Sequence, residues 1–533
     1  MSLPGILRLP TEILVSIFEF KDLQPKWKDA GSIPNIRLTC QRFCALSSHL
    51  LIRKVYVDIS KPETIDRLQS IAADAGLAKG VREVYLRLHF YHSWVAASFK
   101  NFASSVESEW RQRTSPQDYF DEYHLQGCIL RFEQIAYSFI RRLDRTVVDD
   151  ASHHGLEQQS TDNDLDTPGV HVFRPNLVLQ QAYKIYKAGY ESQNRVMRNG
   201  NFNSVFSESL SKFKDLRCVT IYDRELNNNY SPGTTIRVPQ EDHVGQEAAL
   251  VTVFSRPMVW EDSQWIQPNE EIRQGVPVEL LVEIPIAIGA TKVDYLDIQV
   301  TAAPDYSRLP TSPETLSLLS AAIDSMNVFQ FGFQPRCTSG CGPWAVSFND
   351  DAEDLTTAGL NAKSAAELEA LDRYLGTILD CNCIEYADIN LGEFWYSAGF
   401  DSIREAPGSL GTSWFHESAR PRSLHLTQVP LTMADLERIV IKAMVVVDDD
   451  GDDDELEINL QEVYLCNGTW KQFLETLRMA KRNDIKVSFA YLLGGGMDKM
   501  DHDAYSLVWR RLEDGGSMVQ QYIRGRTDRN PLE

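Results

Sequence analysis

The chain has 533 residues, of which 43% are hydrophobic and 24% are charged. This composition excludes a wholly disordered or fibrous chain, and the length allows a large core that needs no disulfide bonds. Lys and Arg number 53 against 75 Asp and Glu, so the net charge of −22 disfavours general binding to nucleic acid or to anionic membranes.

The sequence carries no segment typical of a membrane span or a signal peptide. Glu283 and Pro285 interrupt the most apolar segment, residues 280–290, which is too short for the roughly 20 residues of a spanning helix. Arg8 and Glu12 break up any signal-peptide core. The nine cysteines are odd in number and irregularly spaced, which favours free thiols. We therefore expect an intracellular protein, cytoplasmic or nuclear, without membrane contact.

Two short amphipathic helices are predicted in the first fifty residues. Pro10 suits a first helical turn, and Glu12 suits the positive end of a helix. The apolar residues that follow at helical spacing are Ile13, Leu14, Ile17 and Phe18. A second helical stretch, about 35–48, aligns Ile36, Cys40 and Phe43, with Leu38 and Leu46 beside them. Helices this short cannot bury both apolar faces on each other, so they need a partner.

This region resembles an F-box. The resemblance rests on Leu-Pro-Thr-Glu-Ile-Leu at 9–14 and Ile-Arg-Leu-Thr-Cys-Gln-Arg-Phe at 36–43. It resembles more closely the F-box of large fungal proteins, in which a similar phrase runs into two leucines, basic residues and a strand, as residues 50–57 do here. The polar segment 24–34 is longer than the usual link between these helices. The F-box is assigned to residues 1–53.

The resemblance implies a partner. F-box helices bind the Skp adaptor, which connects them to the cullin scaffold of SCF-type ubiquitin ligases. By this resemblance, the adaptor-binding residues are Leu9, Pro10, Ile13, Leu14, Ile17, Leu38, Cys40 and Phe43. The last three line the second helix, partly as contacts and partly as internal packing. Leu14→Asp or Ile17→Asp is then expected to abolish adaptor binding while the rest of the chain stays folded. The alternative is that these helices are the first hairpin of an ordinary N-terminal domain.

Beyond residue 53 the pattern changes to short strands separated by helices. A phrase of the form apolar-x-x-apolar-x-apolar recurs at Val81, Val84, Leu86; at Leu216, Val219, Ile221; at Val293, Leu296, Ile298; and at Leu460, Val463, Leu465. Weaker copies are Ile384, Ala387, Ile389 and Leu424–Leu426, with a last strand at Val487 and Phe489. Predicted helices lie between them, at 129–143, 364–378, 432–443 and 469–477; Ser364 and Glu367 have the spacing of a capping box.

Alternating strands and helices are typical of a parallel sheet covered by helices. With the recurring phrase, the region resembles a leucine-rich-repeat solenoid. The expected fold is therefore α/β: a short N-terminal helical F-box followed by an irregular leucine-rich-repeat-like α/β array over 54–533. Loop insertions are expected near 149–169 and 447–456. A helical-repeat domain and a Rossmann-like layered domain are the alternatives.

The expected function is substrate recognition in an SCF-type ubiquitin ligase, without enzymatic activity and without a cofactor. The target is an unidentified protein, and aromatic residues are the expected contacts for it. The predicted target-binding residues are Phe394, Trp395, Tyr396, Trp414 and Phe415. The alternatives are a scaffold bound to the adaptor outside a ligase, and a stand-alone α/β enzyme with structural N-terminal helices.

Two patterns have the residue types of a metal site, but their spacing disfavours both. Cys337, Cys341, Cys381 and Cys383 supply four thiols, but a C-x-C pair strains tetrahedral zinc binding. The acidic run 448–455 resembles part of a calcium loop, but Val446 stands where the first ligand would be. We expect no metal site.

Overall fold

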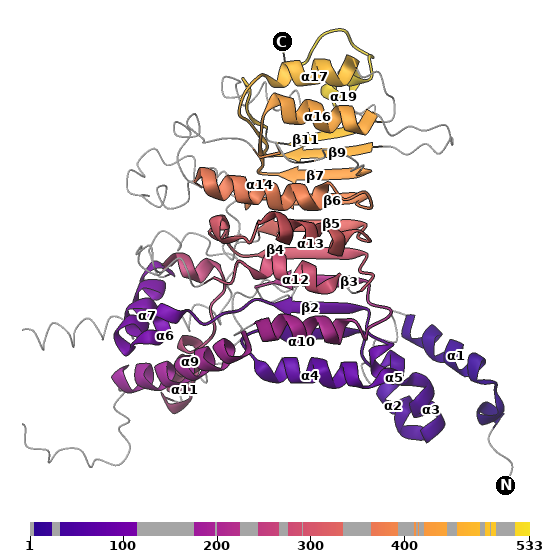
Figure 1. Ribbon diagram of the computed structural model, residues 1–533, viewed down its shortest axis with the longest axis vertical. Helices are drawn as coiled ribbons and strands as arrows, with labels where there is room; N and C mark the ends of the chain where they lie inside the picture. Colours follow the sequence, from indigo (N-terminus) through magenta and orange to yellow (C-terminus); the bar gives the residue numbers. More distant parts are fainter. Residues whose placement is uncertain are drawn as a thin grey trace, which may run out of the picture.

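We describe the protein from a computed structural model. The structure describes residues 5–23, 32–113, 175–197, 200–223, 243–265, 276–289, 291–333, 364–392, 410–411, 414, 421–444, 456–479, 485–490, 492–496 and 517–532. The N-terminus and the C-terminus lie at opposite ends of the long axis (Figure 1).

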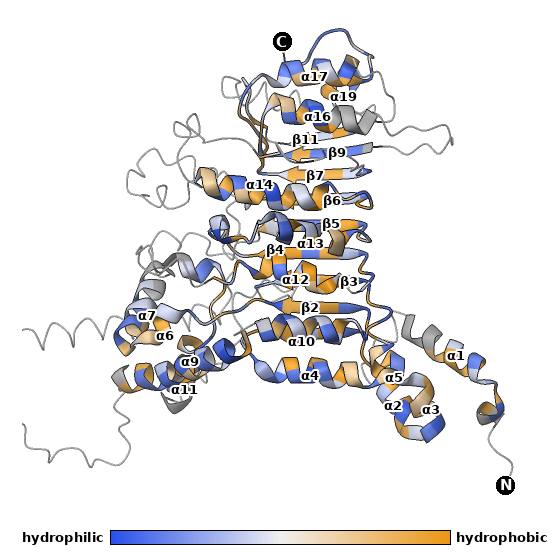
Figure 2. Cartoon of the chain, in the orientation of Figure 1, coloured by the Kyte–Doolittle hydropathy of each residue, from blue (hydrophilic) through white to orange (hydrophobic). Residues whose placement is uncertain are grey.

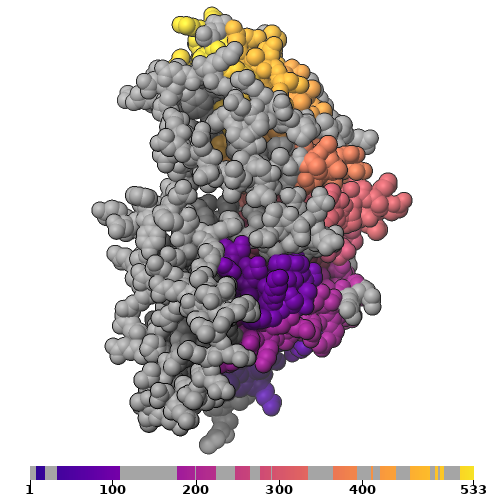
Figure 3. Space-filling view, turned by 90° about the vertical axis from the view of Figure 1, so that its left-hand side faces the viewer, coloured from indigo at the N-terminus to yellow at the C-terminus, as the bar shows by residue number. Residues whose placement is uncertain are grey.

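The main body is built on one nine-stranded sheet. Its strands are β1 (Lys54–Asp58), β2 (Glu83–Arg87), β3 (Cys218–Tyr222), β4 (Tyr295–Val300), β5 (Val328–Phe333), β6 (Tyr386–Asn390), β7 (Ser423–Thr427), β9 (Leu456–Gln461) and β11 (Ile485–Ala490). Every pairing is parallel, and the order of the strands in space is their order in the chain. The colour sequence in Figure 3 follows the same order along the molecule. This order has no reversal, which excludes the doubly wound arrangement of a Rossmann-like domain.

Register explains why the apolar phrase recurs. One row of paired residues crosses the sheet as Val55, Val84, Val219, Leu296, Phe329, Ala387, Leu424, Ile458 and Val487. A second row, two residues later, is Val57, Leu86, Ile221, Ile298, Phe331, Ile389, Leu426, Leu460 and Phe489. All of these side chains except Phe489 are buried. Because side chains two apart share a face, these rows define the inner face of the sheet.

Helices cover the inner face in one layer. They are α4 (Pro62–Ala73), α10 (Asn201–Leu210), α12 (Leu280–Ile288), α13 (Pro313–Ile323), α14 (Ala365–Leu379), α16 (Met433–Met444) and α17 (Trp470–Met479) (Figure 1). Contacts run from α4 through α10, α12 and α13 to α14, and from α16 to α17. α12 is apolar almost all round because helices flank it on both sides (Figure 2). The predicted capping box of Ser364 and Glu367 starts α14, as expected.

Further helices lie beside the sheet or link its parts. α6 (Ser93–Ala97), α7 (Phe99–Arg113), α9 (Pro175–Met197) and α11 (His243–Phe254) pack together to one side, and α5 (Ala75–Ala78) and α19 (Met518–Ile523) contact the two ends of the array. The short 3-10 helix η6 (Glu261–Trp265) follows α11 in the chain and contacts α7, and η8 (Tyr306–Arg308) lies between β4 and α13 in the chain and contacts α14. At the N-terminus stand η1 (Gly5–Arg8), α1 (Thr11–Leu23), α2 (Ser32–Thr39), α3 (Gln41–Ser47) and η3 (Ser48–Leu50).

The segments that follow β7, β9 and β11 form a second, three-stranded parallel sheet. It consists of β8 (Pro430–Leu431), β10 (Tyr464–Leu465) and β12 (Leu493–Gly494). The backbone turns between the two sheets at Gln428 and Glu462, which have φ values of 56° and 53°. The turn at Glu462 divides the phrase Leu460, Val463, Leu465: Leu460 lies in β9 of the main sheet and Leu465 lies in β10 of the second sheet.

The expected α/β class with a large parallel sheet is confirmed, and the other predicted strands lie in it. β5 was not predicted, because the glycine within Phe-Gln-Phe-Gly-Phe weakens its strand pattern. The predicted helix at 129–143 and the expected insertion near 149–169 lie outside the described residues, as does the insertion near 447–456 up to the first residue of β9.

Candidate functional site

The N-terminal helical module, residues 5–23 and 32–50, has a hydrophobic core of its own. Leu14, Phe18, Ile33, Phe43 and Leu50 form a buried cluster separate from the main core. The rings of Phe18 and Phe43 meet edge to face, with centroids 5.3 Å apart. A compact module with its own core can present a surface independently of the body behind it.

Hydrogen bonds fix how the three helices of this module meet. Arg42 Nη2 of α3 donates to the carbonyl oxygen of Leu9 at 2.8 Å, which ties α3 to the segment before α1. Arg37 of α2 donates to the hydroxyl of Ser48 at 2.6 Å. Cys40 caps α3, since its sulfur accepts the Phe43 amide. Cys40 is therefore partly used within the module.

The structure divides the predicted adaptor-binding residues into three groups. Leu14 is fully buried in the module's core, so it does not lie on a contact surface of the chain by itself. Phe43 is 8% exposed and takes the internal-packing part of its expected role. Leu9, Ile17 and Cys40 are half-buried against that core. The exposed residues are Pro10, Ile13 and Leu38. Residues 13 and 14 are adjacent in one apolar stripe, and periodicity alone does not say which of them points inward.

Exposed aliphatic side chains are concentrated in this part of the chain. Ile13 is 48% exposed and Leu38 is 84% exposed. Ile6 and Leu51 are exposed as well, so four of the eleven large apolar residues exposed in the described chain lie between residues 5 and 51. Sequence analysis missed Ile6, although it is apolar and stands directly before the predicted stripe. Apolar side chains left exposed beside a finished core are typical of a protein-binding surface.

The outer face of the sheet, opposite to the inner face, is the second candidate. Its middle row is Tyr56, Tyr85, Thr220, Asp297, Gln330, Asp388, His425, Asn459 and Ser488. The neighbouring row is Lys54, Glu83, Cys218, Tyr295, Val328, Tyr386, Ser423, Glu457 and Lys486. Most of these side chains are half-buried, and they are rich in tyrosine and in hydrogen-bonding groups. Such a surface suits recognition of another protein.

Ion pairs occupy both ends of the outer face. Lys54 Nζ lies 2.7 Å from Glu83 Oε2, and the Tyr85 hydroxyl donates to the same oxygen at 2.6 Å. Burial disfavours the charged Glu83, but the hydrogen bonds from Lys54 and Tyr85 outweigh it and lower its pKa. At the other end, Lys486 Nζ lies 3.1 Å from Glu457 Oε1. Charges at both ends therefore have partners within the chain.

The middle of the outer face differs from its ends, because its carboxyl groups have no ion pair with a described lysine or arginine. Asp297 is 7% exposed; Gln299 Nε2 donates to its Oδ2 at 3.1 Å, and its Oδ1 has no hydrogen-bond partner. Burial raises the pKa of Asp297 to about 6; the Gln299 hydrogen bond opposes the shift, and the charge of Asp388 adds to it. Burial also raises the pKa of Asp388, against the effects of His425 and Tyr386.

His425 forms the centre of a small network on the same face. Its Nδ1 lies 3.2 Å from the Tyr386 hydroxyl and its Nε2 lies 3.2 Å from the Ser423 hydroxyl. A serine and a histidine in contact are also parts of hydrolase sites. Here the Ser423 amide donates to the Glu385 carbonyl within the sheet, so it does not provide an oxyanion hole. The network supports binding better than acyl-transfer chemistry.

The predicted target-binding aromatics are not assembled as a surface. Trp414 is fully buried and belongs to the main core, so its assignment to a recognition surface is wrong. An isolated tryptophan in a sequence does not reveal whether it packs inside or outside. Phe394, Trp395, Tyr396 and Phe415 lie outside the described residues.

No metal site is assembled within the described ranges, where no group of three or more potential ligands meets. Cys381 is buried, and its sulfur donates to the Ile323 carbonyl at 3.4 Å. Burial raises the pKa of this thiol. Cys337 and Cys341 lie outside the described residues, as does the acidic run 448–455.

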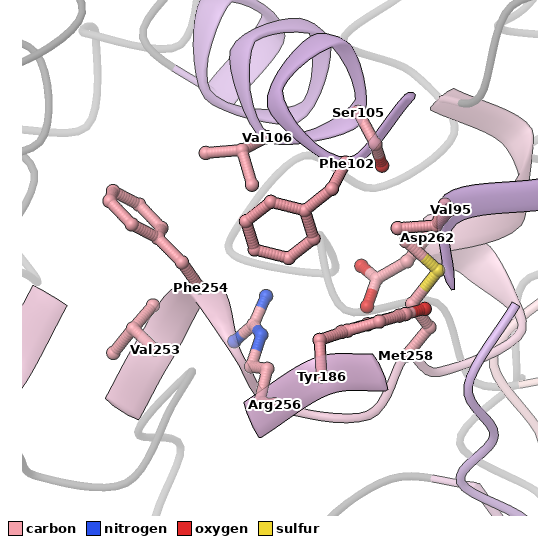
Figure 4. Close-up of a pocket in the computed structure, with 10 residues that line it drawn as sticks. All are labelled: Val95, Phe102, Ser105, Val106, Tyr186, Val253, Phe254, Arg256, Met258 and Asp262. Atoms are coloured by element: carbon pink, nitrogen blue, oxygen red, sulfur yellow. The ribbon is translucent and has the colours of Figure 1, made fainter. Parts of the chain in front are cut away.

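A cavity lies between α7, α9 and the segment after α11, lined by Phe102, Tyr186, Arg256, Met258 and Asp262 among others (Figure 4). Its volume is about 10 Å³, which is room for one water molecule and not for an organic substrate. This cavity does not supply the substrate pocket that the enzyme alternative requires.

None of the helices in the described ranges is long and apolar enough to cross a membrane. No family model matches the chain, and no curated protein or solved structure is found to be similar to it.

Proposed function

We propose that the chain is the substrate-recognition subunit of an SCF-type ubiquitin ligase. The N-terminal helical module binds the Skp adaptor, as its resemblance to an F-box implies, and the leucine-rich-repeat-like α/β array binds a target protein through its outer face. The chain itself performs no bond-making step. It raises the effective concentration of the target near the ubiquitin-charged enzyme that the cullin recruits.

One observation carries this proposal. A small helical module with a separate core is attached to one end of a long parallel array, and it leaves aliphatic side chains exposed. Burying one such side chain contributes roughly 1.5 to 3 kcal/mol, so a few of them sustain a stable interface. Ile13 and Leu38 are the residues most available for adaptor contact, with Pro10 beside Ile13.

Co-purification with the Skp adaptor tests this assignment. The test variant is Ile13→Asp combined with Leu38→Asp, which places charges on the exposed surface and spares the module's core. The matched control is Leu318→Asp on α13, because Leu318 is also an exposed leucine, at 59% exposure, but lies in the array. We expect adaptor binding to be lost in the first variant and retained in the second. Adaptor binding that survives both charges would refute the adaptor assignment.

Cullin co-precipitation with the wild-type chain separates two roles of an adaptor-bound protein. Recovery of the cullin together with the adaptor supports the ligase. Recovery of the adaptor alone would indicate a scaffold that works outside a ligase.

A further inference from the structure

Two strands of the array carry the same outward-facing pattern. β4 reads Tyr295-Leu-Asp297 and β6 reads Tyr386-Ala-Asp388. Side chains two apart in a strand share a face, so each strand places a tyrosine beside an aspartate on the outer face. The register pairs both motifs with the single intervening strand, β5, where Gln330 lies between the two carboxyl groups.

These two aspartates differ from the other carboxyl groups of the outer face. Within the described strands this face carries five carboxyl groups, and three of them lie near a lysine or arginine: Glu83 near Lys54, Glu457 near Lys486, and Asp58 near Arg87. Neither Asp297 nor Asp388 forms an ion pair with a described lysine or arginine; His425 and the Tyr386 hydroxyl act on Asp388, and Asp297 has neither kind of neighbour. Asp297 is more than nine-tenths buried and has one oxygen without a hydrogen-bond partner.

A buried carboxylate without a cation is costly, and a ligand that brings the cation removes the cost. A tyrosine ring next to the carboxylate favours the same ligand, because a lysine or arginine side chain is attracted both to the carboxylate and to the aromatic face. The Tyr295 hydroxyl is already held by Gln330, and the Tyr386 hydroxyl by His425, so both rings are fixed before binding. The two Tyr–Asp pairs thus have the composition of preformed cation sites.

We propose that the middle of the outer face binds a basic segment of the target protein, and that the pairs Tyr295–Asp297 and Tyr386–Asp388 each receive one lysine or arginine side chain. This inference rests on the proposed function, since it names the class of target segment that the array recognises. The two carboxyl groups are two strand spacings apart, roughly 10 Å. An extended segment in the polyproline II conformation places side chains i and i+3 on one side, roughly 9 Å apart, which matches this spacing.

A labelled peptide tests the proposal on the full-length protein. The probe is fluorescein-Gly-Arg-Pro-Pro-Arg-Gly, and its matched partner carries citrulline, a neutral isostere, in place of both arginines. Binding is measured by fluorescence anisotropy at about 0.15 M salt, where exposed charges more than about 8 Å apart are largely screened. We expect the arginine peptide to bind at least tenfold more tightly than the citrulline peptide. Equal binding of the two peptides, or none of either, would overturn the proposal.

Variants place the binding on the outer face. Asp297→Asn with Asp388→Asn removes two negative charges with little change in shape. The control is Glu208→Gln with Glu369→Gln, the same change of charge at two helix residues whose side chains are 74% and 70% exposed in the opposite layer. We expect at least a tenfold loss of affinity in the first variant and less than a twofold change in the second. An equal loss in both would mean that the peptide responds only to net charge, and the proposal would fail.

The failure of this inference is distinguishable from failure of the proposed function. The Ile13→Asp, Leu38→Asp variant should keep full affinity for the arginine peptide, because the helical module is remote from the middle of the sheet. If the chain binds the adaptor but does not bind the arginine peptide, the inference is refuted and the ligase assignment is not affected. Peptide binding without adaptor binding would do the reverse.

Discussion

Gly80 lies against the backbone of His49 so closely that a Cβ atom at residue 80 would be 1.8 Å from the His49 carbonyl oxygen. His49 belongs to η3 at the end of the N-terminal helical module, and Gly80 lies between α5 and β2 of the array. Only glycine permits this approach, and α5 and η3 are in contact next to it. The placement of the module on the array thus depends on a missing side chain.

Gly80→Ala should therefore loosen the module from the array. The clash involves backbone on both sides, so it cannot be relieved by moving a side chain, and we expect a loss of about 1 to 3 kcal/mol in local stability. Hydrogen exchange of the amides in α3 and η3 measures it. Gly332→Ala is the control, because a Cβ there would meet only Asn390 Cβ at an ordinary 3.7 Å. Equal protection of η3 in both variants would contradict the docking role of Gly80.

Leu14 and Ile13 should respond oppositely to truncation, although they are neighbours in one stripe. Leu14→Ala removes a fully buried side chain from the module's core and should cost about 2 to 5 kcal/mol of the module's stability. Ile13→Ala changes a side chain that is 48% exposed and should cost about 0.5 kcal/mol or less. Hydrogen exchange of α1 gives the stability, and adaptor titration gives the affinity.

Of these two variants, only Ile13→Ala should weaken adaptor binding without unfolding the module. Leu14→Asp, which the stripe by itself recommends as a surface test, would abolish binding by unfolding the helices. A normal exchange pattern in Leu14→Ala would show that the module's core is arranged differently.

Asp297 should make the protein less stable at neutral pH than at acid pH. Its pKa in the folded state is about 6, above the ordinary value of 3.8, so folding takes up a proton between these values. The charged carboxyl group therefore costs folding stability above about pH 6, and the cost disappears below about pH 4. Asp297→Asn should raise the free energy of unfolding by about 2 to 3 kcal/mol at pH 7.5 and leave it nearly unchanged at pH 4. Urea titrations at both pH values measure the difference; an equal effect at both would contradict it.

Binding of the arginine peptide should depend on the same titration. The groups that act on Asp297 are Gln299 on its own strand and Asp388 on β6, with Tyr295 and the Cys218 thiol close by. Protonation of Asp297 removes one of the two charges offered to the ligand, so affinity should fall as the pH drops through about 6. Anisotropy titrations between pH 5 and pH 8 follow this. Asp297→Asn should flatten that part of the profile, and a profile unchanged by the substitution would contradict the assignment.

Gln428 and Glu462, the two turn residues between the sheets, are joined by a hydrogen bond. Gln428 Nε2 donates to Glu462 Oε2 at 2.8 Å, and both side chains are buried. Gln428→Leu removes the donor from a buried acidic group and should lower the free energy of unfolding by about 1 to 3 kcal/mol. Glu462→Gln keeps an acceptor for Gln428 and should cost less. Thermal unfolding of the three proteins ranks them, and a ranking in the opposite order would contradict the role of this hydrogen bond.

The sequence alone determined the fold class and most of the strands. Residues such as Leu296 and Ile298, or Ala387 and Ile389, alternate with polar neighbours, and alternation with period two is a local property of a strand. The start of the helix from Ala365 to Leu379 was equally predictable from the sequence, because its capping box lies within four consecutive residues. Asp297 and Asp388 were visible as polar residues between these apolar ones, and the repeated Tyr-x-Asp pattern was the signal that could have singled them out.

Only the tertiary structure decided which residues of each pattern are buried, which are exposed, and which distant residues lie side by side. Leu14 and Ile13 have the same chemistry, and the packing of Phe18 and Phe43 put one inside and the other outside. Trp414 is fully buried in the main core, against its predicted role on a recognition surface. The pairing of Asp297 with Asp388 across β5 likewise joins residues 91 positions apart, as the register of three strands fixes it. Local periodicity carries no information about such contacts, since they are set by which surfaces meet when the chain closes on itself.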